Sequence, residues 1–456
     1  MGDFMKIVIV GCGKIGTTIL SSLVNEGHSV VAVDNNPAVI NEISNSYDVM
    51  CVIGNGADCE TLAEAGIEKA EMFVAVTDSD EVNMLSCYMA KRMGANYTVA
   101  RIRTPEYNDK SLDFMCQQLG ISLPINPELY AAKELYNILK FPSALNIETF
   151  SSRNFEMIEI QLKSDSVLDG ITLSEMRKSY QAQFIVCVVR RGEDVFIPKG
   201  DFVLHSGDRI GLTATKNEMQ KLLRSLGILQ KKAKSVMLLG ATTTSFYLAK
   251  MLLAVGNSVK IIDPDEKRCL EFSKNLPGAV VIMGDGAHPE VLVEEGIESV
   301  DAFVALTGMD EENILISFFA QSQGVSKVIT KVSRNELISM AEKVGIESVV
   351  SPLRTISDVI SRYARALNNS MGSNIETLYH LMDSKAEALE FNVQPDFKYI
   401  NIPLKEMKIK DNVLLAGIIR RPKTIIPTGD DVILAGDRVV VLATGEKMDD
   451  LSDIIK

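Results

Sequence analysis

The chain contains two copies of one sequence unit, separated by 229 or 230 positions along its 456 residues. Residues 6–11 (KIVIVG) match 235–240 (SVMLLG), and residues 73–77 (FVAVT) match 303–307 (FVALT). The other matching segments are 31–34 with 260–263, 51–57 with 281–287, 197–201 with 426–430, and 207–209 with 436–438. A constant offset over so many segments indicates duplication. The chain is therefore expected to fold as two similar halves.

The first part of each half has the pattern of a parallel sheet. Up to about residue 120, short Val- and Ile-rich runs alternate with amphipathic segments, and each run is continuously apolar. Such runs are typical of strands that helices cover on both faces. The runs predicted as strands are 7–10, 30–33, 49–53, 72–76 and 98–102. The predicted fold class is α/β: two tandem Rossmann-like, doubly wound parallel-sheet domains, each followed by a small α+β domain.

Residues beyond about 120 predict a helix and then a smaller module. A helix over 128–139 is flanked by prolines and is interpreted as a crossover, and apolar strands at 156–162 and 184–189 precede further turn signals. The linker between the halves is predicted at Lys231–Lys234. The predicted boundaries are 5–125 and 235–350 for the Rossmann-like domains, 126–150 and 351–374 for the crossover helices, and 151–230 and 375–456 for the small domains.

A glycine-rich loop is the one strong chemical motif. It follows the first predicted strand, opens a predicted helix, and has the GxGxxG spacing, with Asp34 at the end of the next strand. Its residues are Gly11, Cys12, Gly13, Lys14, Ile15 and Gly16. The glycines permit close approach of a pyrophosphate to the backbone, and the helix N-terminus offers N–H groups to that anion. The loop therefore predicts nucleotide binding.

Asp34 predicts which nucleotides this loop accepts. Its carboxylate is placed to accept hydrogen bonds from both adenosine-ribose hydroxyls and would repel a phosphate there. Asn35 and Asn36 provide no arginine for such a phosphate, so NAD(H) is favoured over NADP(H). ATP and ADP carry the same diol and pyrophosphate, and the motif does not distinguish them from NAD.

Other candidate ligand residues follow the next strands, because ligands of such sheets bind at the carboxyl ends of the strands. These candidates are Asn55, Gly56, Asp58, Thr77, Asp78 and Arg101. Asp58, Asp78 and Asp80 are equally compatible with helix capping. Arg101 suits a phosphate, or it is an ordinary exposed or ion-paired side chain.

The second glycine loop is degenerate. It reads Gly240-Ala-Thr-Thr-Thr-Ser245, so two glycines are lost, while Asp263 stands where Asp34 stands in the first half. Gly240 and Asp263 stay candidate ligand residues. The second site is expected to bind more weakly, to bind a different ligand, or to bind none.

Composition excludes several classes of function. The formal net charge of −13 does not fit a general nucleic-acid-binding protein. The seven cysteines form no C-x-x-C pair, which argues against a disulfide framework or a zinc site. Only four histidines are present, and no catalytic constellation is found, so no enzymatic activity is predicted. Cys12 is either a low-pKa thiol at a helix N-terminus or a small residue that fills the loop.

The order of these modules resembles the RCK (regulator of potassium conductance) domains of the TrkA family, each with a TrkA-N and a TrkA-C part. The resemblance covers essentially the whole chain and is carried by the glycine loop, Asp34, residues 54–58 and 77–80, and the Gly-Asp-Arg turns at 207 and 436. By this resemblance, the positions that bind nucleotide in the family correspond to Gly11, Gly13, Gly16, Asp34, Thr77, Asp78 and Arg101. In the second half they carry onto Gly240, Asp263 and Thr307, with Lys331 in place of Arg101.

The resemblance implies a cytoplasmic subunit, peripheral at the inner face of the membrane, that binds NAD(H) or ATP/ADP. Such a subunit assembles as a homo-oligomeric ring, a dimer or tetramer of chains, and gates an integral-membrane potassium transporter subunit of the Trk type. Two alternatives stay open on the residues alone. One is an NAD-dependent oxidoreductase, and the other is a nucleotide-sensing scaffold for a soluble partner.

Overall fold

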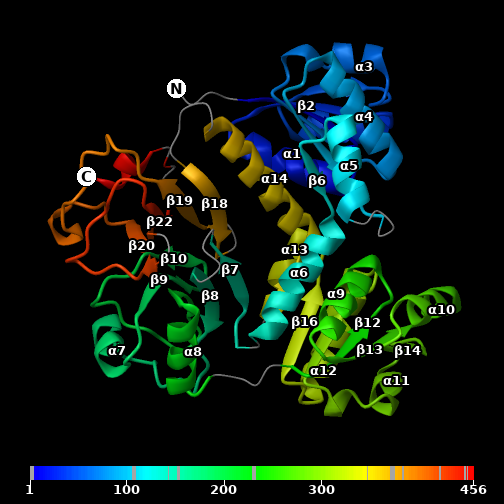
Figure 1. Ribbon diagram of the computed structural model, residues 1–456. Helices are drawn as coiled ribbons and strands as arrows, with labels where there is room; N and C mark the ends of the chain where they lie inside the picture. Colours follow the sequence, from blue (N-terminus) through cyan, green and yellow to red (C-terminus); the bar gives the residue numbers. More distant parts are fainter. Residues whose placement is uncertain are drawn as a thin grey trace. The chain divides into compact units, whose positions relative to one another are not determined.

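The computed structural model describes residues 5–104, 109–141, 143–150, 155–228, 233–346, 348–369, 375–382, 385–420, 423–445, 448 and 450–456. Contacts divide the chain into two compact units, Met1–Leu135 with Ser235–Ala364 and Tyr136–Lys234 with Arg365–Lys456. The first unit holds two parallel sheets and the second holds two antiparallel sheets, which confirms the predicted fold class (Figure 1). The predicted domain boundaries stay predictions, and residues 231 and 232 of the predicted linker lie outside the described ranges.

The first Rossmann-like domain is a six-stranded parallel sheet in the order β3-β2-β1-β4-β5-β6. Its strands are β1 (Lys6–Val10), β2 (Ser29–Asp34), β3 (Met50–Ile53), β4 (Met72–Ala75), β5 (Tyr97–Arg101) and β6 (Leu123–Ile125). Its helices are α1 (Lys14–Asn25), α2 (Pro37–Ser46), α3 (Cys59–Glu64), α4 (Asp80–Met93) and α5 (Asp109–Leu119). The strand order reverses between β1 and β4, and ligands of such sheets bind at the carboxyl ends of the strands beside this reversal.

The sixth strand corrects the sequence prediction. Residues 123–125 lie within the predicted domain 5–125, but the five predicted strands do not include them. They form β6, which pairs with β5 at the edge of the sheet. An edge strand tolerates proline, since one of its sides needs no N–H donor.

The second Rossmann-like domain repeats this topology in the order β14-β13-β12-β15-β16-β17. Its strands are β12 (Ser235–Leu239), β13 (Ser258–Asp263), β14 (Val280–Met283), β15 (Ala302–Ala305), β16 (Lys327–Lys331) and β17 (Ser348–Val350). Its helices are α9 (Thr243–Ala254), α10 (Glu266–Asn275), α11 (Pro289–Glu294), α12 (Asp310–Ser322) and α13 (Asn335–Lys343). The two domains therefore share one fold, and their corresponding residues serve as matched controls for each other.

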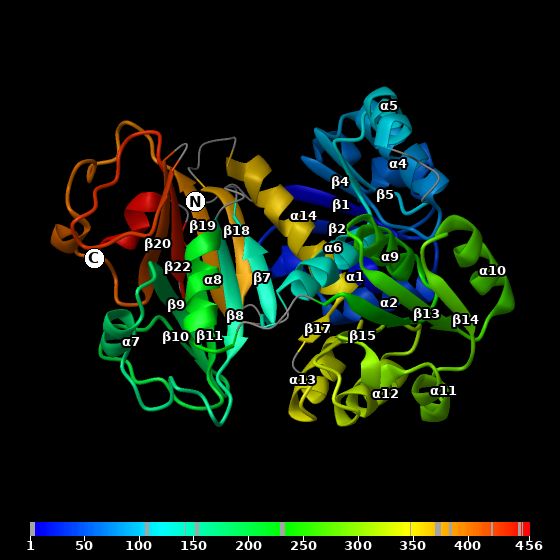
Figure 2. The same ribbon diagram turned by 60° about the horizontal axis from the view of Figure 1, so that its bottom comes forward.

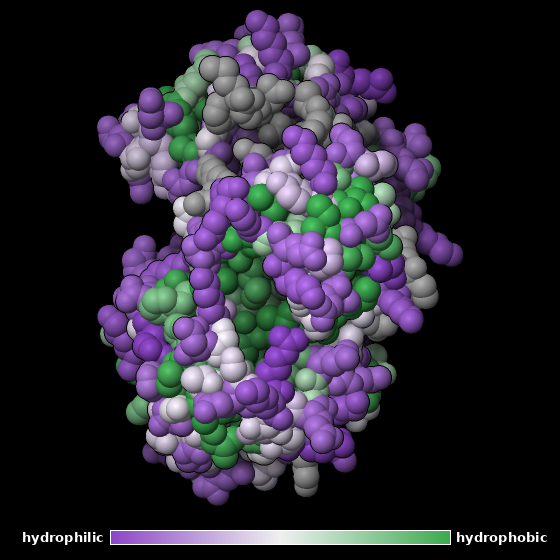
Figure 3. Space-filling model, turned by 90° about the vertical axis from the view of Figure 1, so that its left-hand side faces the viewer, coloured by the Kyte–Doolittle hydropathy of each residue, from purple (hydrophilic) through white to green (hydrophobic). Residues whose placement is uncertain are grey.

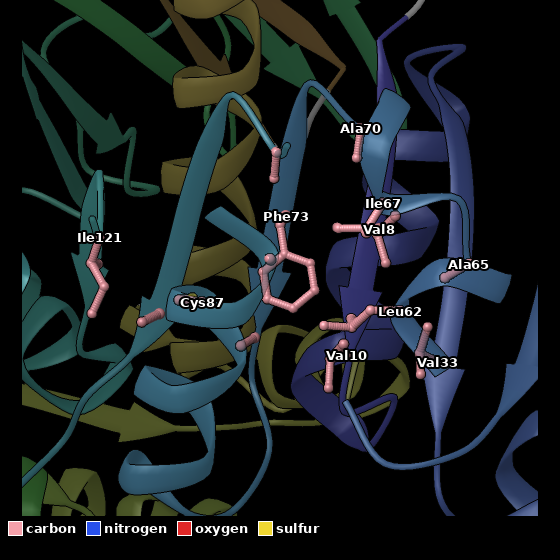
Figure 4. Packing of buried hydrophobic residues seen from close by; sticks show 14 of the residues in the cluster. Val8, Val10, Val33, Leu62, Ala65, Ile67, Ala70, Phe73, Cys87 and Ile121 are labelled. Atoms are coloured by element: carbon pink, nitrogen blue, oxygen red, sulfur yellow. The ribbon is translucent and has the colours of Figure 1, made fainter. Parts of the chain in front are cut away.

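Both Rossmann-like sheets are buried on both faces, as their apolar strands predict. In the first domain Val8, Phe73 and Leu62 are fully buried, and Figure 4 shows Phe73 between the strands and the covering helices. The equivalent Phe303 is fully buried in the second domain. Burying a side chain of this size contributes about 2 kcal/mol to folding, so the two cores hold the strand ends in fixed positions.

The small domains are antiparallel and pack against each other in the second unit. The first comprises β7 (Asn146–Thr149), β8 (Phe155–Gln161), α7 (Leu173–Ser179), β9 (Phe184–Arg191), β10 (Asp194–Phe196), β11 (Arg209–Thr215) and α8 (Lys216–Ser225). The second comprises β18 (Ile375–Leu381), β19 (Ala386–Asn392), β20 (Val413–Arg420), β21 (Lys423–Ile425) and β22 (Arg438–Ala443). One hydrophobic cluster contains residues from both sheets. A Cβ on Gly417 would lie 2.4 Å from Cζ of Phe155, so the sheets meet closely.

The Gly-Asp-Arg turns of the small domains have a structural role. Gly207 has a φ of +89°, and the buried carboxylate of Asp208 accepts two hydrogen bonds from Arg191, both of 2.8 Å. In the second copy Asp437 accepts equivalent bonds from Arg420 at 2.8 and 2.7 Å. The turn therefore ties one strand end to a neighbouring strand through a bidentate ion pair.

Two crossover helices, α6 (Pro127–Lys140) and α14 (Pro352–Asn369), leave the Rossmann-like domains. Although α14 follows the second domain, it lies beside α1 of the first (Figures 1 and 2). The hydroxyls of Ser22 and Ser361 are 2.9 Å apart, and the rings of Tyr97 and Tyr363 meet edge to face. The crossover helix that follows the second Rossmann-like domain thus packs against the first.

Glu134 in α6 predicts a pH dependence of stability. It is half-buried, its Oε2 accepts a 2.7 Å hydrogen bond from Thr355, and desolvation raises its pKa above the ordinary 4.5. A carboxyl group with a raised pKa in the folded chain binds more protons folded than unfolded, so the free energy of unfolding falls as the pH rises above about 4.5. Glu134→Gln is expected to remove this part of the slope in urea unfolding between pH 4.5 and 7. The exposed Glu68→Gln is the control, and an unchanged slope in Glu134→Gln would contradict the prediction.

The described part of the face drawn in Figure 3 is largely polar. Hydrophilic residues cover much of the face drawn in Figure 3, with hydrophobic side chains in smaller areas between them. None of the helices in the described residues is long and apolar enough to span a membrane.

Candidate functional site

The glycine loop joins β1 to α1 at the reversal of strand order. Gly11 has a φ of +87°, and a Cβ added there would lie 2.7 Å from the backbone nitrogen of Thr77. A Cβ on Gly16 would lie 2.0 Å from the carbonyl oxygen of Gly11. These two positions therefore need glycine for packing alone, because backbone atoms occupy the space of a side chain.

Gly13 differs from the other two glycines. It is exposed, and no heavy atom lies within 4 Å of a Cβ added to it. Lys14, at the start of α1, is exposed, and Ile15 is half-buried. Packing in this chain does not explain a glycine at position 13, whereas close approach of a ligand to the backbone does.

Asp34 lies beside the loop at the end of β2. Its Oδ2 accepts a 2.7 Å hydrogen bond from the backbone N–H of Cys12, and its Oδ1 accepts a 2.9 Å bond from Asn36. The residue is partly exposed. Since a carboxylate has about four lone-pair sites, Asp34 retains the capacity to accept from the two hydroxyls of a ribose.

Cys12 is a small residue that fills the loop. Its side chain is 1% exposed, and burial, with the nearby charge of Asp34, raises its pKa to about 12. The alternative of a low-pKa thiol is therefore wrong, because desolvation outweighs the effect of the helix N-terminus.

The burial of Cys12 predicts its reactivity. A thiol reagent such as 5,5′-dithiobis(2-nitrobenzoate) at pH 8 is expected to modify the exposed Cys59 and to leave Cys12 unmodified in the folded chain. Mass spectrometry of the digested protein measures both sites. In urea both thiols should react, and rapid labelling of Cys12 in the folded chain would contradict this structure of the loop.

The residues after β3 mainly build the local turn. The side-chain oxygen of Asn55 accepts from the N–H of Ala57 at 3.0 Å, and a Cβ on Gly56 would lie 2.0 Å from Cγ1 of Val10. Asp58 is the N-cap of α3, and hydrogen bonds from Thr61 lower its pKa. The capping interpretation of Asp58 is therefore confirmed.

The loop after β4 is organised by Asn83, which the sequence analysis did not single out as a site residue. Oδ1 of this fully buried side chain accepts from the N–H and the hydroxyl of Thr77 at 2.8 and 2.7 Å. Its Nδ2 donates to the carbonyl of Arg101 at 3.0 Å. Asn313 makes the equivalent bonds to Thr307 and Lys331. The same Asn recurs in both halves of the sequence, and this recurrence could have identified it as a residue that organises the loop.

The other acidic residues of this loop have separate roles. The capping interpretation of Asp78 is wrong, because Ser79 caps α4 and the side chain of Asp78 is fully exposed. Asp80 is buried, and its Oδ2 accepts hydrogen bonds from the backbone N–H groups of Arg103 and Thr104, both at 2.9 Å. The first turn of α4 thereby holds the segment that follows β5.

Arg101 lies at the end of β5 and is ion-paired. It is 7% exposed, and its Nη2 lies 3.2 Å from Oε1 of Glu128, in the first turn of α6. Its Nε and Oε2 of Glu128 are buried without a partner. Buried unpaired polar atoms are costly, so this pair has unused capacity for a ligand. Sequence analysis did not identify Glu128 or Arg103, whose Nη2 donates to the carbonyl of Asp78 at 2.7 Å.

The second domain closes the equivalent site with its own side chains. The hydroxyl of Ser245 donates to the carbonyl of Gly240 at 2.5 Å. Asp263 is 2% exposed and accepts from Ala241 and Asp265, as Asp34 does from its neighbours. In addition, Nη1 of Arg268 lies 3.3 Å from Oδ2 of Asp263.

In the first domain, the position that matches Arg268 is residue 39, which is a valine. The carboxylate of the second domain is therefore covered and neutralised, whereas that of the first is accessible. This difference supports the interpretation of the second site as degenerate.

Known protein families match the chain in the order of its domains. The model of the TrkA-N domain matches residues 7–127 and 236–352, and that of the TrkA-C domain matches residues 157–227 and 388–456. The chain belongs to the TrkA family. The resemblance of its motifs to this family is thereby confirmed.

Relatives in this family align over almost their whole lengths. The Trk system potassium uptake protein TrkA homolog of Archaeoglobus fulgidus is 31% identical, over 99% of this chain and 100% of the relative. Homolog 1 of Methanosarcina mazei is 32% identical over the same shares, and TrkA of Vibrio alginolyticus is 29% identical over 97% and 96%. Among solved structures, the GsuK channel bound to NAD superposes with a TM-score of 0.63 at 16% identity, covering 97% of this chain and 77% of that one. GsuK bound to ADP has a TM-score of 0.52 at 13% identity, with 81% and 71% covered.

Proposed function

We propose that this chain is a non-enzymatic regulatory subunit that binds NAD(H), ATP or ADP in its first Rossmann-like domain and gates a Trk-type potassium-translocating membrane subunit. The observation that carries the nucleotide part is the open Gly13 beside the accessible carboxylate of Asp34. The family and the names of its members, potassium uptake proteins, support the transport part. The titles of the GsuK structures, which name NAD and ADP, support the ligand class.

Each candidate residue has a role in this proposal. The N–H groups at the start of α1, from Gly13, Lys14 and Ile15, receive the pyrophosphate, and Asp34 accepts from the adenosine ribose. Gly11 and Gly16 keep the loop tight, and Cys12 fills it. Thr77, Asp78 and Arg101 form the rim on the β4–β5 side, while Asn55, Gly56 and Asp58 form it on the β3 side. Gly240 and Asp263 mark the degenerate counterpart.

The rim contacts favour regulation over hydride transfer. Asn83, Asp80 and Glu128 hold backbone segments or Arg101 through hydrogen bonds and ion pairs. Such side chains respond to a ligand by shifting their partners, whereas an oxidoreductase needs a proton-handling group beside the nicotinamide. Turnover of the bound dinucleotide with a small metabolite would favour the alternative enzyme.

We further propose a homo-oligomeric ring, a dimer or tetramer of chains, on the cytoplasmic side of the membrane subunit. Exposed apolar side chains at equivalent positions of the two Rossmann-like domains support self-association. Leu85 in α4 and Leu315 in α12 are 50% and 68% exposed. Exposed apolar side chains are typical of protein–protein interfaces, and their recurrence at equivalent positions suits a symmetric assembly of copies.

Reconstitution tests the regulatory role. The chain, co-expressed with the Trk-type membrane subunit of its own organism, is expected to co-purify with it and to make potassium flux into liposomes depend on added nucleotide. Asp34→Ala should co-purify but give flux that no longer responds to nucleotide. Co-purification only with a soluble partner would favour the scaffold alternative, and a flux unaffected by the wild-type chain would refute the proposed function.

A further inference from the structure

One tyrosine of the second Rossmann-like domain reaches the ligand edge of the first. Tyr247 lies in α9, just beyond the degenerate glycine loop. Its hydroxyl lies 3.1 Å from Nδ2 of Asn126 and donates to the carbonyl of Arg103 at 3.3 Å. Arg103 follows the carboxyl end of β5, and Asn126 directly follows β6. Both partners therefore belong to the strand ends at which ligands of such sheets bind.

The two partners of Tyr247 organise the rim of the first site. The N–H of Arg103 donates to Asp80 at 2.9 Å, and its guanidinium donates to the carbonyl of Asp78 at 2.7 Å. Asn126 accepts from the N–H of Leu129 at 2.9 Å and so caps the start of α6. The first turn of α6 also carries Glu128, the partner of Arg101. A single hydroxyl thus contacts both the segment after β5 and the residue that caps the crossover helix, and Arg103 joins that segment to the β4 loop.

The matching position in the first domain has no such role. Position 18 is threonine, and its exposed hydroxyl donates to the carbonyl of Lys14 within its own helix. Tyr247 of the second domain therefore contacts the first domain, whereas Thr18, at the matching position of the first domain, bonds within its own helix. Through this contact, the second Rossmann-like domain supports the first site without binding a ligand itself.

We propose that Tyr247 is a positioning residue through which the second Rossmann-like domain completes the rim of the first nucleotide site, and through which that site's occupancy reaches α9. This inference rests on the proposed nucleotide binding. A rim held in place before binding lowers the cost of ordering it around the ligand. A ligand that orders Arg103 also stabilises the bond of its carbonyl to Tyr247, since linkage is reciprocal.

The test is hydrogen–deuterium exchange of the full chain with and without saturating ADP or NADH, together with calorimetric titration. In the wild type we expect protection of residues 101–104 and 126–130 and also of the first turns of α9. Tyr247→Phe should weaken binding about three- to tenfold and, at saturation, retain protection at 101–104 while losing it in α9. Thr18→Val, the matched variant of the first domain, should behave as the wild type in both measurements.

Asp34→Ala separates this coupling from direct binding at the second site. If protection of α9 comes through Tyr247, it should disappear in Asp34→Ala at ligand concentrations that saturate the wild type. Protection of α9 that persists in Asp34→Ala, or in Tyr247→Phe, would overturn the coupling while leaving nucleotide binding intact. Absence of any binding heat and of any protection in the wild type would instead refute the proposed function, and this inference with it.

Discussion

Asp34→Ala is expected to lower the affinity of the chain for NADH or ADP about 100-fold, whereas Asp263→Ala should change it less than about twofold. Each hydrogen bond to a charged group contributes about 1.5–3 kcal/mol, so losing the acceptor of a ribose diol accounts for about 3 kcal/mol, or about two orders of magnitude. Asp263 is already covered by Arg268 and is 2% exposed, so its removal costs no ligand contact. Isothermal titration calorimetry measures both affinities.

The two variants control for each other's structural effects. Each carboxylate accepts a 2.7 Å hydrogen bond from the backbone N–H of the residue that follows the first loop glycine. Each also accepts a 2.9 Å hydrogen bond from the backbone N–H two residues after the aspartate itself. Each substitution therefore removes these two internal bonds, and Asp263→Ala also removes the ion pair with Arg268, so thermal unfolding should show at least as large a loss of stability in Asp263→Ala as in Asp34→Ala. Equal losses of nucleotide affinity in the two variants would contradict the assignment of sensing to the first domain.

Gly13→Ala and Gly16→Ala are expected to separate ligand approach from packing. A Cβ at Gly16 would lie 2.0 Å from the carbonyl oxygen of Gly11, so this variant should lose about 3 kcal/mol of stability and its nucleotide binding together. A Cβ at Gly13 meets no heavy atom within 4 Å, and its φ of −67° suits alanine. Gly13→Ala should therefore unfold within about 0.5 kcal/mol of the wild type, yet bind nucleotide at least about tenfold more weakly.

The informative variant of this pair is Gly13→Ala. A loss of affinity without a loss of stability means that the ligand occupies the space beside Gly13. Calorimetric titration and thermal denaturation of the same preparation measure the two quantities. Wild-type affinity in Gly13→Ala would show that nucleotide, if bound, does not approach the loop backbone, and the proposed site would be wrong.

The sequence predicted the fold because its signals are local and duplicated. Continuous apolar runs such as residues 7–10 specify buried parallel strands, and the constant offset between the halves gives each run a second occurrence. β6 was missed because it is three residues long and contains Pro124, a pattern that resembles a loop. The edge position that tolerates this proline is visible only once the strand order is known.

The part of the candidate site that lies within one sequence motif could be predicted from the sequence. The glycine loop and Asp34 are near each other in sequence, and the structure brings them together through a 2.7 Å bond. Glu128 and Tyr247 were not identified, because their partners lie far away in the sequence. Arg268 is close to Asp263 in the sequence, but its ion pair depends on the direction of a helical side chain, which the motif does not specify. Tyr247 and Asn126 are 121 positions apart and meet only through the packing of the two domains.

The most direct test of the central claim is calorimetric titration of the purified chain with NADH, NAD, ATP and ADP. We expect saturable binding of at least one of them with a stoichiometry near one per chain, since one of the two duplicated sites is closed by its own side chains. Two equivalent sites per chain would contradict the assigned asymmetry. No binding of any of the four would leave Gly13 without a role in ligand approach and would contradict nucleotide sensing by this chain.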